Sequence, residues 1–485
     1  MTTQQPTLIE QLVIDARKAQ ASINKYSQEQ VDELILAVAW EVIQPKNNQE
    51  LSEMAVEQTG LGDIEDKKRK NRRKTLGLLR DLKDVKSVGI IKDNTKNGII
   101  EIARPIGVIG AVVPSTNPIA TPLNKVINAL KCRNAIILAP SPKGAQVCSR
   151  VVELIQQALV RIGAPKNIVQ SLPEPISKED TNELSRLVDL IVATGSQNNI
   201  QRALQSGTPT LGVGVGNVPS IIDETANLEE ASHKIMTSKT FDNATSCSSE
   251  NSIIIVESVY ESMIQSLKKE GGSLLNSQEK DILKKSMWND NGIINRDIIA
   301  KKSNEIASLA GLGDNHLNSK FLMVEEQNVG SEHPFSMEKL SPVLAVYKAQ
   351  NFDHAVEVAT EILNNISTPG EDLSGGLETL RMLEPKTISA FLINEHPQTA
   401  AIILAHLDDK VVGGVFAELP EEKRTEIMLR LATLERVSPN VIRELDVALQ
   451  GELRSQGASS GNRLGGVELA AQIIICSLLV ARTRL

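Results

Sequence analysis

Hydrophobic residues recur with two different periods along this chain. Over residues 31–42 they return every three or four positions, which predicts an amphipathic helix, and Ser27 with Gln30 has the spacing of a capping box at its start. From about residue 99 the apolar residues form short continuous runs, separated by segments of helical period. The clearest helical segment is 141–163, which ends at the helix-stopping Gly163. The apolar runs are IIEIARPIGVIGAVVP (99–114), NAIILAP (134–140), LVDLIVATG (187–195), NSIIIVES (251–258) and SPVLAVYKA (341–349).

Apolar strands that alternate with helices are typical of an α/β fold, because helices on both sides of a parallel sheet bury both faces of its strands. The first part of the chain is therefore predicted to contain mostly parallel sheets. After Asn365 the strand-like runs stop, and ISTPGEDLSGG (366–376) has the composition of a linker. Beyond it, short amphipathic segments interrupted by prolines at 397, 420 and 439 predict an all-helical second part.

Length and composition restrict the class of protein. A chain of 485 residues exceeds one hydrophobic core and predicts about two to four domains. The net charge of −8 argues against a dedicated nucleic-acid binder. Four cysteines without CxxC spacing indicate a reducing cytosol, and we expect no metal site. The N-terminus lacks a signal-peptide pattern and no apolar run reaches the ~18 residues of a membrane span, so we expect a cytoplasmic protein.

Residues 66–74, DKKRKNRRK, form the densest basic run of the chain. We interpret the run as a solvated helix face, because charge runs usually face water. A patch that attracts phosphate groups is the alternative.

Cys247 lies among small and hydroxyl residues in TFDNATSCSSENSIII (240–255), just ahead of a predicted strand. A nucleophilic thiol needs small neighbours so that a substrate carbon can approach it. Taken alone, a structural thiol is the commoner interpretation of a single cysteine. Local charge does not select this one either, because Cys132 has the more cationic neighbours.

Two further segments carry groups suited to carbonyl chemistry and to phosphate binding. Asn117 follows an apolar strand, and its amide could donate a hydrogen bond to an oxyanion, although Asn-Pro is also ordinary turn chemistry. Thr194, Gly195 and Ser196 join a predicted strand to a predicted helix, whose N-terminal amides can receive a dinucleotide's phosphates. The glycines of GVGVGN (212–217), Gly214 among them, let backbone approach a ligand closely.

In this order, five motifs resemble the aldehyde dehydrogenase superfamily, and most closely its CoA-acylating branch. The resemblance runs from the N-terminus to about residue 364 and implies a Rossmann-type dinucleotide-binding domain followed by a catalytic α/β domain. The expected divisions are 1–230 for the former and 231–364 for the latter. The motifs are PSTNP (114–118), ATGS (193–196), GVGVGNVP (212–219), FDNATSCSSE (241–250) and EKLSPVLAVY (338–347).

The resemblance implies a role for each matching residue. Cys247 would be the nucleophile, and Asn117 with the Cys247 backbone N–H would form the oxyanion hole. Thr194, Gly195 and Ser196 would line the site for NAD or NADP, and Glu338 would hold the nicotinamide ribose. The family's activity is oxidation of an aldehyde through a cysteine thioester.

The glycine-rich GVGVGN stands where hydrolytic members of the family place a glutamate base. Without a carboxylate to activate water, the thioester is expected to persist until coenzyme A attacks it. The motif around Cys247 favours sulfoacetaldehyde as the substrate, while acetaldehyde and semialdehydes remain open, as does the choice between NAD and NADP.

After residue 364 the resemblance to dehydrogenases stops, although that family's catalytic domain continues for roughly another hundred residues. A linker at 365–375 is expected to lead into a helical module at 376–485. This module resembles the middle domain of the flagellar motor switch protein FliG, which has an armadillo-like helical fold. The resemblance implies that Glu395, His396, Pro397 and Gln398 form an exposed ridge for the switch protein FliM. The simpler interpretation is that Pro397 merely begins a helix.

Three functions therefore remain in view. The first is a CoA-acylating aldehyde dehydrogenase with a helical appendage. The second is a motor-switch scaffold segment whose dehydrogenase part is an inactive remnant. The third is a fusion in which neither part works as its parent does, because uncovered sheet edges and apolar faces favour misassembly. Assembly into a homo-oligomer is left open.

Overall fold

The computed structural model divides into two compact units, Met1–Pro369 and Gly370–Leu485, which are described separately. The linker expected at 365–375 lies outside the described residues except for Asn365, and so does Pro439. The described residues are 6–434 without 95–97, 290–291, 331, 366–379, 381–382, 394 and 408, together with 441, 445–446 and 449.

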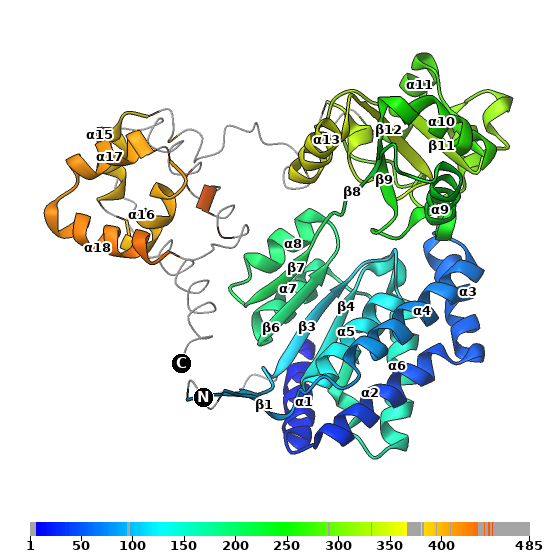
Figure 1. The fold of residues 1–485 in the computed structure, drawn as a ribbon. Coiled ribbons are helices and arrows are strands. Elements are labelled where there is room, and N and C mark those ends of the chain that lie inside the picture. Colours follow the sequence, from blue (N-terminus) through cyan, green and yellow to red (C-terminus); the bar gives the residue numbers. More distant parts are fainter. Residues whose placement is uncertain are drawn as a thin grey trace. The chain divides into compact units, whose positions relative to one another are not determined.

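The first sheet is parallel throughout and has the strand order β5-β4-β3-β6-β7 (Figure 1). The chain enters at the central strand β3, builds outward through β4 and β5, and then returns to the other side of β3 with β6 and β7. The direction of winding therefore reverses between β3 and β6, where open α/β sheets bind their ligands. The strands are β3 (Val108–Val113), β4 (Ala135–Pro140), β5 (Val169–Ser171), β6 (Leu190–Thr194) and β7 (Thr210–Val213).

Helices cover both faces of this sheet, as the continuous apolar strands predict. The helices that connect β3, β4 and β5 are α5 (Ala120–Lys131) and α6 (Ala145–Arg161), and those that lead to β6 and β7 are α7 (Lys178–Leu187) and α8 (Gln197–Leu204). The predicted capping box at Ser27 and Gln30 is confirmed, and Gly163 beyond α6 has a φ of +72°. The N-terminal helices are α1 (Leu8–Ile23), α2 (Gln28–Ile43), α3 (Pro45–Thr59) and α4 (Ile64–Leu82).

The second sheet is also parallel, with the order β10-β11-β12-β9-β8. Its strands are β8 (Val218–Ile222), β9 (Glu250–Val256), β10 (Gly272–Leu274), β11 (Phe321–Glu325) and β12 (Val343–Ala349). Because β8 pairs with β9, the change of sheet falls between Val213 and Val218. The accompanying helices are α9 (Leu228–Thr240), α10 (Tyr260–Lys269), α11 (Ser277–Met287), α12 (Ser303–Ala310) and α13 (Phe352–Asn364).

The apolar run at 99–114 does not form one strand of a covered sheet. Its first part is β2 (Ile99–Ala103), which pairs with β1 (Gly89–Asn94) in a separate antiparallel hairpin, and only its second part is β3. Ile100 and Ile102 are each 54% exposed, so apolar character alone did not identify a buried strand here.

The second unit contains helices only among its described residues. They are α15 (Pro385–Leu392), α16 (Pro397–Leu404), α17 (Asp409–Glu418) and α18 (Glu421–Ala432). Their apolar faces form a separate core that includes Leu392, Ile403 and Val415. Within the part of the chain that the structure describes, no helix combines the length and the apolarity needed to cross a membrane.

Candidate active site

Asn117 lies directly beyond the carboxyl end of β3, at the point where the winding of the first sheet reverses. Its side-chain Oδ1 is buried and has no hydrogen-bond partner among the described residues. This oxygen can accept a hydrogen bond from a ligand, whereas the Nδ2 group of the same amide is the one that could donate to an oxyanion. Lys125 of α5 donates to Val112 O at 2.8 Å and Val192 O at 2.6 Å, and thereby ties β3 to β6 below this point.

Thr194 is the last residue of β6, and Gly195 and Ser196 follow it at the same edge of the sheet. Ser196 is the N-cap of α8, yet its side chain makes no capping hydrogen bond, so the first-turn amides of α8 lack a side-chain acceptor. Gly214 lies beside this helix start, where a Cβ would come within 2.6 Å of Gln197 Oε1. The structure thus brings these four predicted residues together around a helix N-terminus, an arrangement that fits the phosphates of a dinucleotide.

Cys247 is exposed on the loop between α9 and β9. Just before it, Asp242, Asn243 and Ala244 have φ values of 50°, 51° and 58°. The left-handed region costs a residue with a side chain about 1–2 kcal/mol, so three in succession persist only where the surroundings hold them.

The fully buried carboxylate of Asp242 makes the contacts that stabilise this strained turn. It accepts a hydrogen bond from Asp63 N at 2.8 Å and forms ion pairs with Lys67, at 3.2 Å, and with Lys70. Burial alone would raise the pKa of Asp242, but the charges of Lys70 and Lys67 outweigh it and hold the pKa below its usual value. The loop that carries Cys247 is therefore fastened to α4.

This arrangement corrects the interpretation of the basic run at 66–74. The run lies on α4, but Lys67 and Lys70 are buried against Asp242 and are not on a solvated face. Burial lowers the pKa of Lys70 to about 8, with Lys67 adding to the effect and Asp242 opposing it. A charged pair of this kind cannot be recognised from sequence, because Asp242 is 175 residues from Lys67.

Cys247 and Glu338 meet at Gly216. A Cβ on Gly216 would lie 3.2 Å from Cys247 O, 3.4 Å from Cys247 Cβ and 3.6 Å from Glu338 Oε1. The close approach of these segments explains why this position of GVGVGN is glycine. Glu338 and Cys247 therefore both lie against Gly216, while the expected roles of Glu338 at the nicotinamide ribose and of Asn117 in an oxyanion hole stay predictions.

Glu338 is set in an unusual group of buried charges. Burial raises its pKa to about 7, opposed by a hydrogen bond from the Gly216 backbone and by the charges of Lys339 and Lys239. Burial likewise lowers the pKa of Lys239 to about 7, and that of Lys339 well below its usual value. The two lysines are held by carbonyls: Lys239 donates to Glu250 O at 2.7 Å, and Lys339 to Phe335 O at 2.6 Å. Sequence inspection singled out neither lysine.

Burial disfavours the thiolate form of the other two described cysteines. Burial raises the pKa of Cys148 to about 12. Burial also raises the pKa of Cys132, against the opposing charges of Lys131 and Arg133. The cationic neighbours that favoured Cys132 in the sequence therefore do not make it the more reactive thiol.

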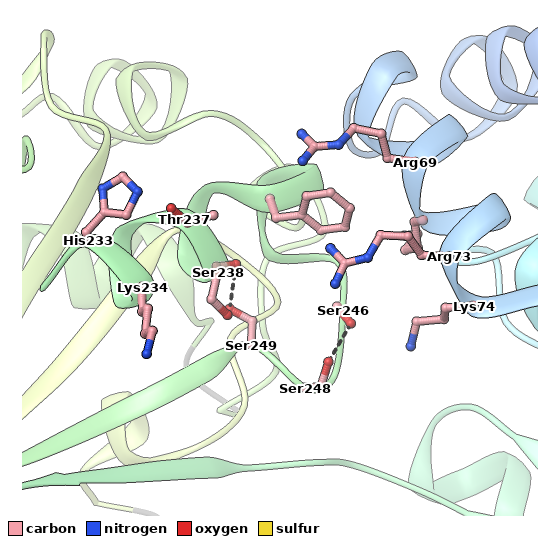
Figure 2. A pocket seen from close by; sticks show the side chains of 12 residues that line it. Arg69, Arg73, Lys74, His233, Lys234, Thr237, Ser238, Ser246, Ser248 and Ser249 are labelled. Carbon is pink, nitrogen blue, oxygen red and sulfur yellow. Dashed lines mark hydrogen bonds between the residues drawn. The ribbon is translucent and has the colours of Figure 1, made fainter. Parts of the chain in front are cut away.

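A cleft of about 590 Å³ opens beside the Cys247 loop, and sequence reasoning did not find it (Figure 2). Residues of α4 line one side, residues of α9 the other, and Ser246 and Ser248 contribute from the loop. The only signal in the sequence was the basic run at 66–74, because Arg69, Lys70, Arg73 and Lys74 all line the cleft.

Two parallel sheets, the first with a dinucleotide-type switch point between β3 and β6, and a cysteine loop between α9 and β9 define the class of the first unit. The sequence profile of the aldehyde dehydrogenase family matches residues 1–363, and the chain belongs to that family. The profile of the FliG middle domain matches residues 385–460.

Several of the relatives are named as acylating enzymes. The chain is 51% identical over 347 residues to an acylating sulfoacetaldehyde dehydrogenase from Cupriavidus necator, a match that covers 71% of this chain and 70% of the relative. Among solved structures, an acetylating aldehyde dehydrogenase from Geobacillus thermoglucosidasius has a TM-score of 0.70 at 37% identity, covering 74% of this chain and 78% of that one. A propionaldehyde dehydrogenase from Rhodopseudomonas palustris with bound propionyl-CoA has a TM-score of 0.66 at 30% identity, with the same coverage. The chain is thus an acylating aldehyde dehydrogenase by family, and CoA-dependent aldehyde oxidation is its class of reaction.

In the helical unit, the four residues expected to form a ridge are not equally exposed. His396 is exposed, Glu395 and Gln398 are half-buried, and Pro397 is buried. His396 is the N-cap of α16 and accepts a hydrogen bond from Gln398 N at 3.2 Å, while Pro397 begins the helix. Of these four residues, His396 therefore has the most accessible side chain.

Proposed function

We propose that this chain oxidises sulfoacetaldehyde to sulfoacetyl-CoA with NAD(P) as the electron acceptor. The observation that carries the proposal is the packing of Gly216 against Cys247, which leaves no room for a carboxylate at that point of GVGVGN. The similarity to acylating sulfoacetaldehyde dehydrogenases supports the choice of aldehyde.

The Cys247 thiolate adds to the carbonyl carbon of the aldehyde, and the carbonyl oxygen becomes an oxyanion. The Asn117 side chain and the Cys247 backbone N–H donate hydrogen bonds to that oxyanion. One such donor is worth about 3 kcal/mol of the barrier. NAD(P), when bound, supplies the acceptor for the hydride that leaves the former carbonyl carbon. What remains on Cys247 is a thioester.

The residues at the switch point fit the cofactor. The open first turn of α8 and Thr194, Gly195, Ser196 and Gly214 would receive its phosphates, and Glu338 its nicotinamide ribose. The CoA thiol then attacks the thioester carbon, its proton is released to solvent, and the Cys247 thiolate leaves. Aldehyde, CoA and NAD(P)+ are thereby converted to acyl-CoA, NAD(P)H and a proton.

The test is an assay of the full chain that follows NAD(P)H absorbance with sulfoacetaldehyde, with and without CoA. We expect turnover only with CoA, and a loss of at least roughly 1,000-fold in Cys247→Ser, because a hydroxyl is a far weaker nucleophile than a thiolate. Cys132→Ser is the matched control and is expected to retain activity. Turnover that is unchanged when CoA is withheld would refute the acylating assignment.

The second candidate function is binding of a FliM-type partner by the helical unit, and the observation that favours it is the profile match at 385–460. Glu395, His396 and Gln398 would contact the partner, with Pro397 fixing the start of α16. A pull-down of FliM with the double variant Glu395→Ala, His396→Ala should recover less partner than the parent chain. Glu422→Ala, an exposed substitution, is the control. Equal recovery of FliM by the parent chain, the double variant and the control would show that Glu395 and His396 do not contribute to binding.

A further inference from the structure

The cleft beside the Cys247 loop is strongly cationic. Of the residues that line it, five are lysines or arginines and none is a carboxylate. Three of these cations form ion pairs with nearby carboxylates. The other two, both on α4, do not. The neutralised ones pair as Lys70–Asp242, Arg69–Asp66 (3.5 Å) and Lys234–Glu230 (2.7 Å).

Arg73 and Lys74 are the two that have no carboxylate partner among the described residues. Both are exposed, and Figure 2 shows them on the wall of the cleft that faces the cysteine loop. An arginine that neither pairs nor stacks is free to present its guanidinium fork to an anion from outside. Arg69 differs, because its guanidinium lies 5.7 Å from the centre of the Phe241 ring and helps to wall the cleft.

The loop that carries Cys247 contributes to the lining of the cleft. Ser246 and Ser248, the residues on either side of Cys247, line it, and their hydroxyls lie 2.9 Å apart. A small aldehyde that approaches the Cys247 sulfur from this side of the loop would have its other end in this cleft.

We propose that Arg73, assisted by Lys74, binds the anionic group of the aldehyde and makes the enzyme specific for sulfonated over neutral aldehydes. The inference rests on the proposed function and assigns the residues that select its substrate. A sulfonate offers three acceptor oxygens and keeps its negative charge throughout the physiological range. It can take two parallel hydrogen bonds from a guanidinium, which a neutral aldehyde of the same length cannot.

The first test compares Arg73→Gln with the parent chain on sulfoacetaldehyde and on acetaldehyde. Losing a charge-assisted contact should lower kcat/KM for sulfoacetaldehyde about 10- to 100-fold, and change kcat/KM for acetaldehyde less than about twofold. Arg72→Gln is the matched control, since Arg72 is the exposed neighbour on α4 that does not line the cleft, and it should change neither value.

An equal loss with both aldehydes, or no loss with either, would overturn the proposal. So would a rise in KM for CoA with both aldehydes affected alike, since that result would assign the cleft to the phosphates of CoA. These outcomes would overturn only the role of Arg73. Failure of the proposed function would instead appear as a parent chain without CoA-dependent turnover of sulfoacetaldehyde.

The second test needs no turnover. 2-Bromoethanesulfonate carries its sulfonate at the same distance from the electrophilic carbon as sulfoacetaldehyde does, whereas 2-bromoethanol is its neutral counterpart. Mass spectrometry of the Cys247 peptide should show faster alkylation by the sulfonate in the parent chain. Arg73→Gln should remove this preference, Arg72→Gln should keep it, and Cys132 should show none. A parent chain without the preference would refute the role of Arg73 even if no aldehyde is oxidised.

Discussion

At the scale of single residues, the site depends on Gly216, where the lack of a side chain lets neighbouring segments approach one another. Gly216 leaves room for Cys247 and Glu338 to approach one another, and a methyl group there would press on Cys247 O at 3.2 Å. The sequence showed a glycine-rich segment, but it could not show which glycine faces the thiol. That depends on how the connection from β7 to β8 passes the cysteine loop.

Glu338 should make dinucleotide binding depend on pH. Burial raises its pKa to about 7, so the carboxylate, which we propose accepts hydrogen bonds from the nicotinamide ribose, is present above about pH 7 and protonated below it. We therefore expect the Kd for NAD(P)+ to rise roughly tenfold as the pH falls from 8 to 6.

Isothermal titration calorimetry of the parent chain, Glu338→Gln and the exposed Glu332→Gln would measure this dependence. Glu338→Gln should bind weakly at every pH, with a flat profile, while Glu332→Gln should follow the parent. A parent profile that is flat between pH 6 and 8 would show that this carboxyl does not contact the cofactor.

At the scale of elements, α4 has two functions that its sequence combines in one basic run. Lys67 and Lys70 face inward and hold the strained turn at Asp242, whereas Arg73 and Lys74 face the cleft. The helical period predicts that residues three and four apart share a face, but not which face meets a buried carboxylate. The prediction of a solvated helix face therefore holds for Arg69, Arg72, Arg73 and Lys74, which are exposed, and is wrong for Lys67 and Lys70.

Asp242→Asn should destabilise the dehydrogenase unit and misplace its nucleophile. Removing one partner of a buried ion pair leaves the two lysines uncompensated, which costs about 3–5 kcal/mol of unfolding free energy. Since the folded-state pKa of Asp242 is depressed, its contribution is present above the unfolded pKa of about 3.9 and is lost as the pH falls below it.

Denaturant unfolding at pH 7 would measure the loss, and the alkylation rate of Cys247 by iodoacetamide would report the position of the thiol. Arg72→Gln, an exposed substitution on the same helix, should change the unfolding free energy by less than about 0.5 kcal/mol. Equal stabilities of Asp242→Asn and the parent would mean that the turn is held by other contacts.

At the scale of the whole molecule, the β1–β2 hairpin exposes an apolar surface. Ile90 and Ile102 are directly opposite one another, and with Ile100 each is more than half exposed. An isolated two-stranded hairpin is marginally stable in water, and exposed apolar patches of this kind mark interfaces. We therefore predict that copies of this chain associate through the hairpin.

Replacing Ile100 and Ile102 by lysine should shift the chain toward the monomer, which sedimentation velocity would show as a lower mass. Val160→Lys is the control, because Val160 is 60% exposed on α6, away from the hairpin. A parent chain that sediments as a monomer at micromolar concentration would contradict the prediction.

The sequence by itself determined the class of this protein. The alternation of apolar strands with helices predicted parallel sheets, the ordered motifs predicted an acylating aldehyde dehydrogenase followed by a FliG-like helical part, and the family profiles agree. Periodicity and motifs are local properties, so they can be recognised without knowing how the chain folds back on itself.

Only the tertiary structure decided which charges are buried, which strand is exposed and what borders the thiol. Lys67 and Lys70 became partners of Asp242, part of an apolar run became an exposed hairpin, and Arg73 came to line a cleft beside Ser246. Each of these outcomes depends on the desolvation or exposure of a side chain by segments far away in sequence. Local composition does not predict those contacts, because the same lysine is solvated or buried depending on which segments pack against it.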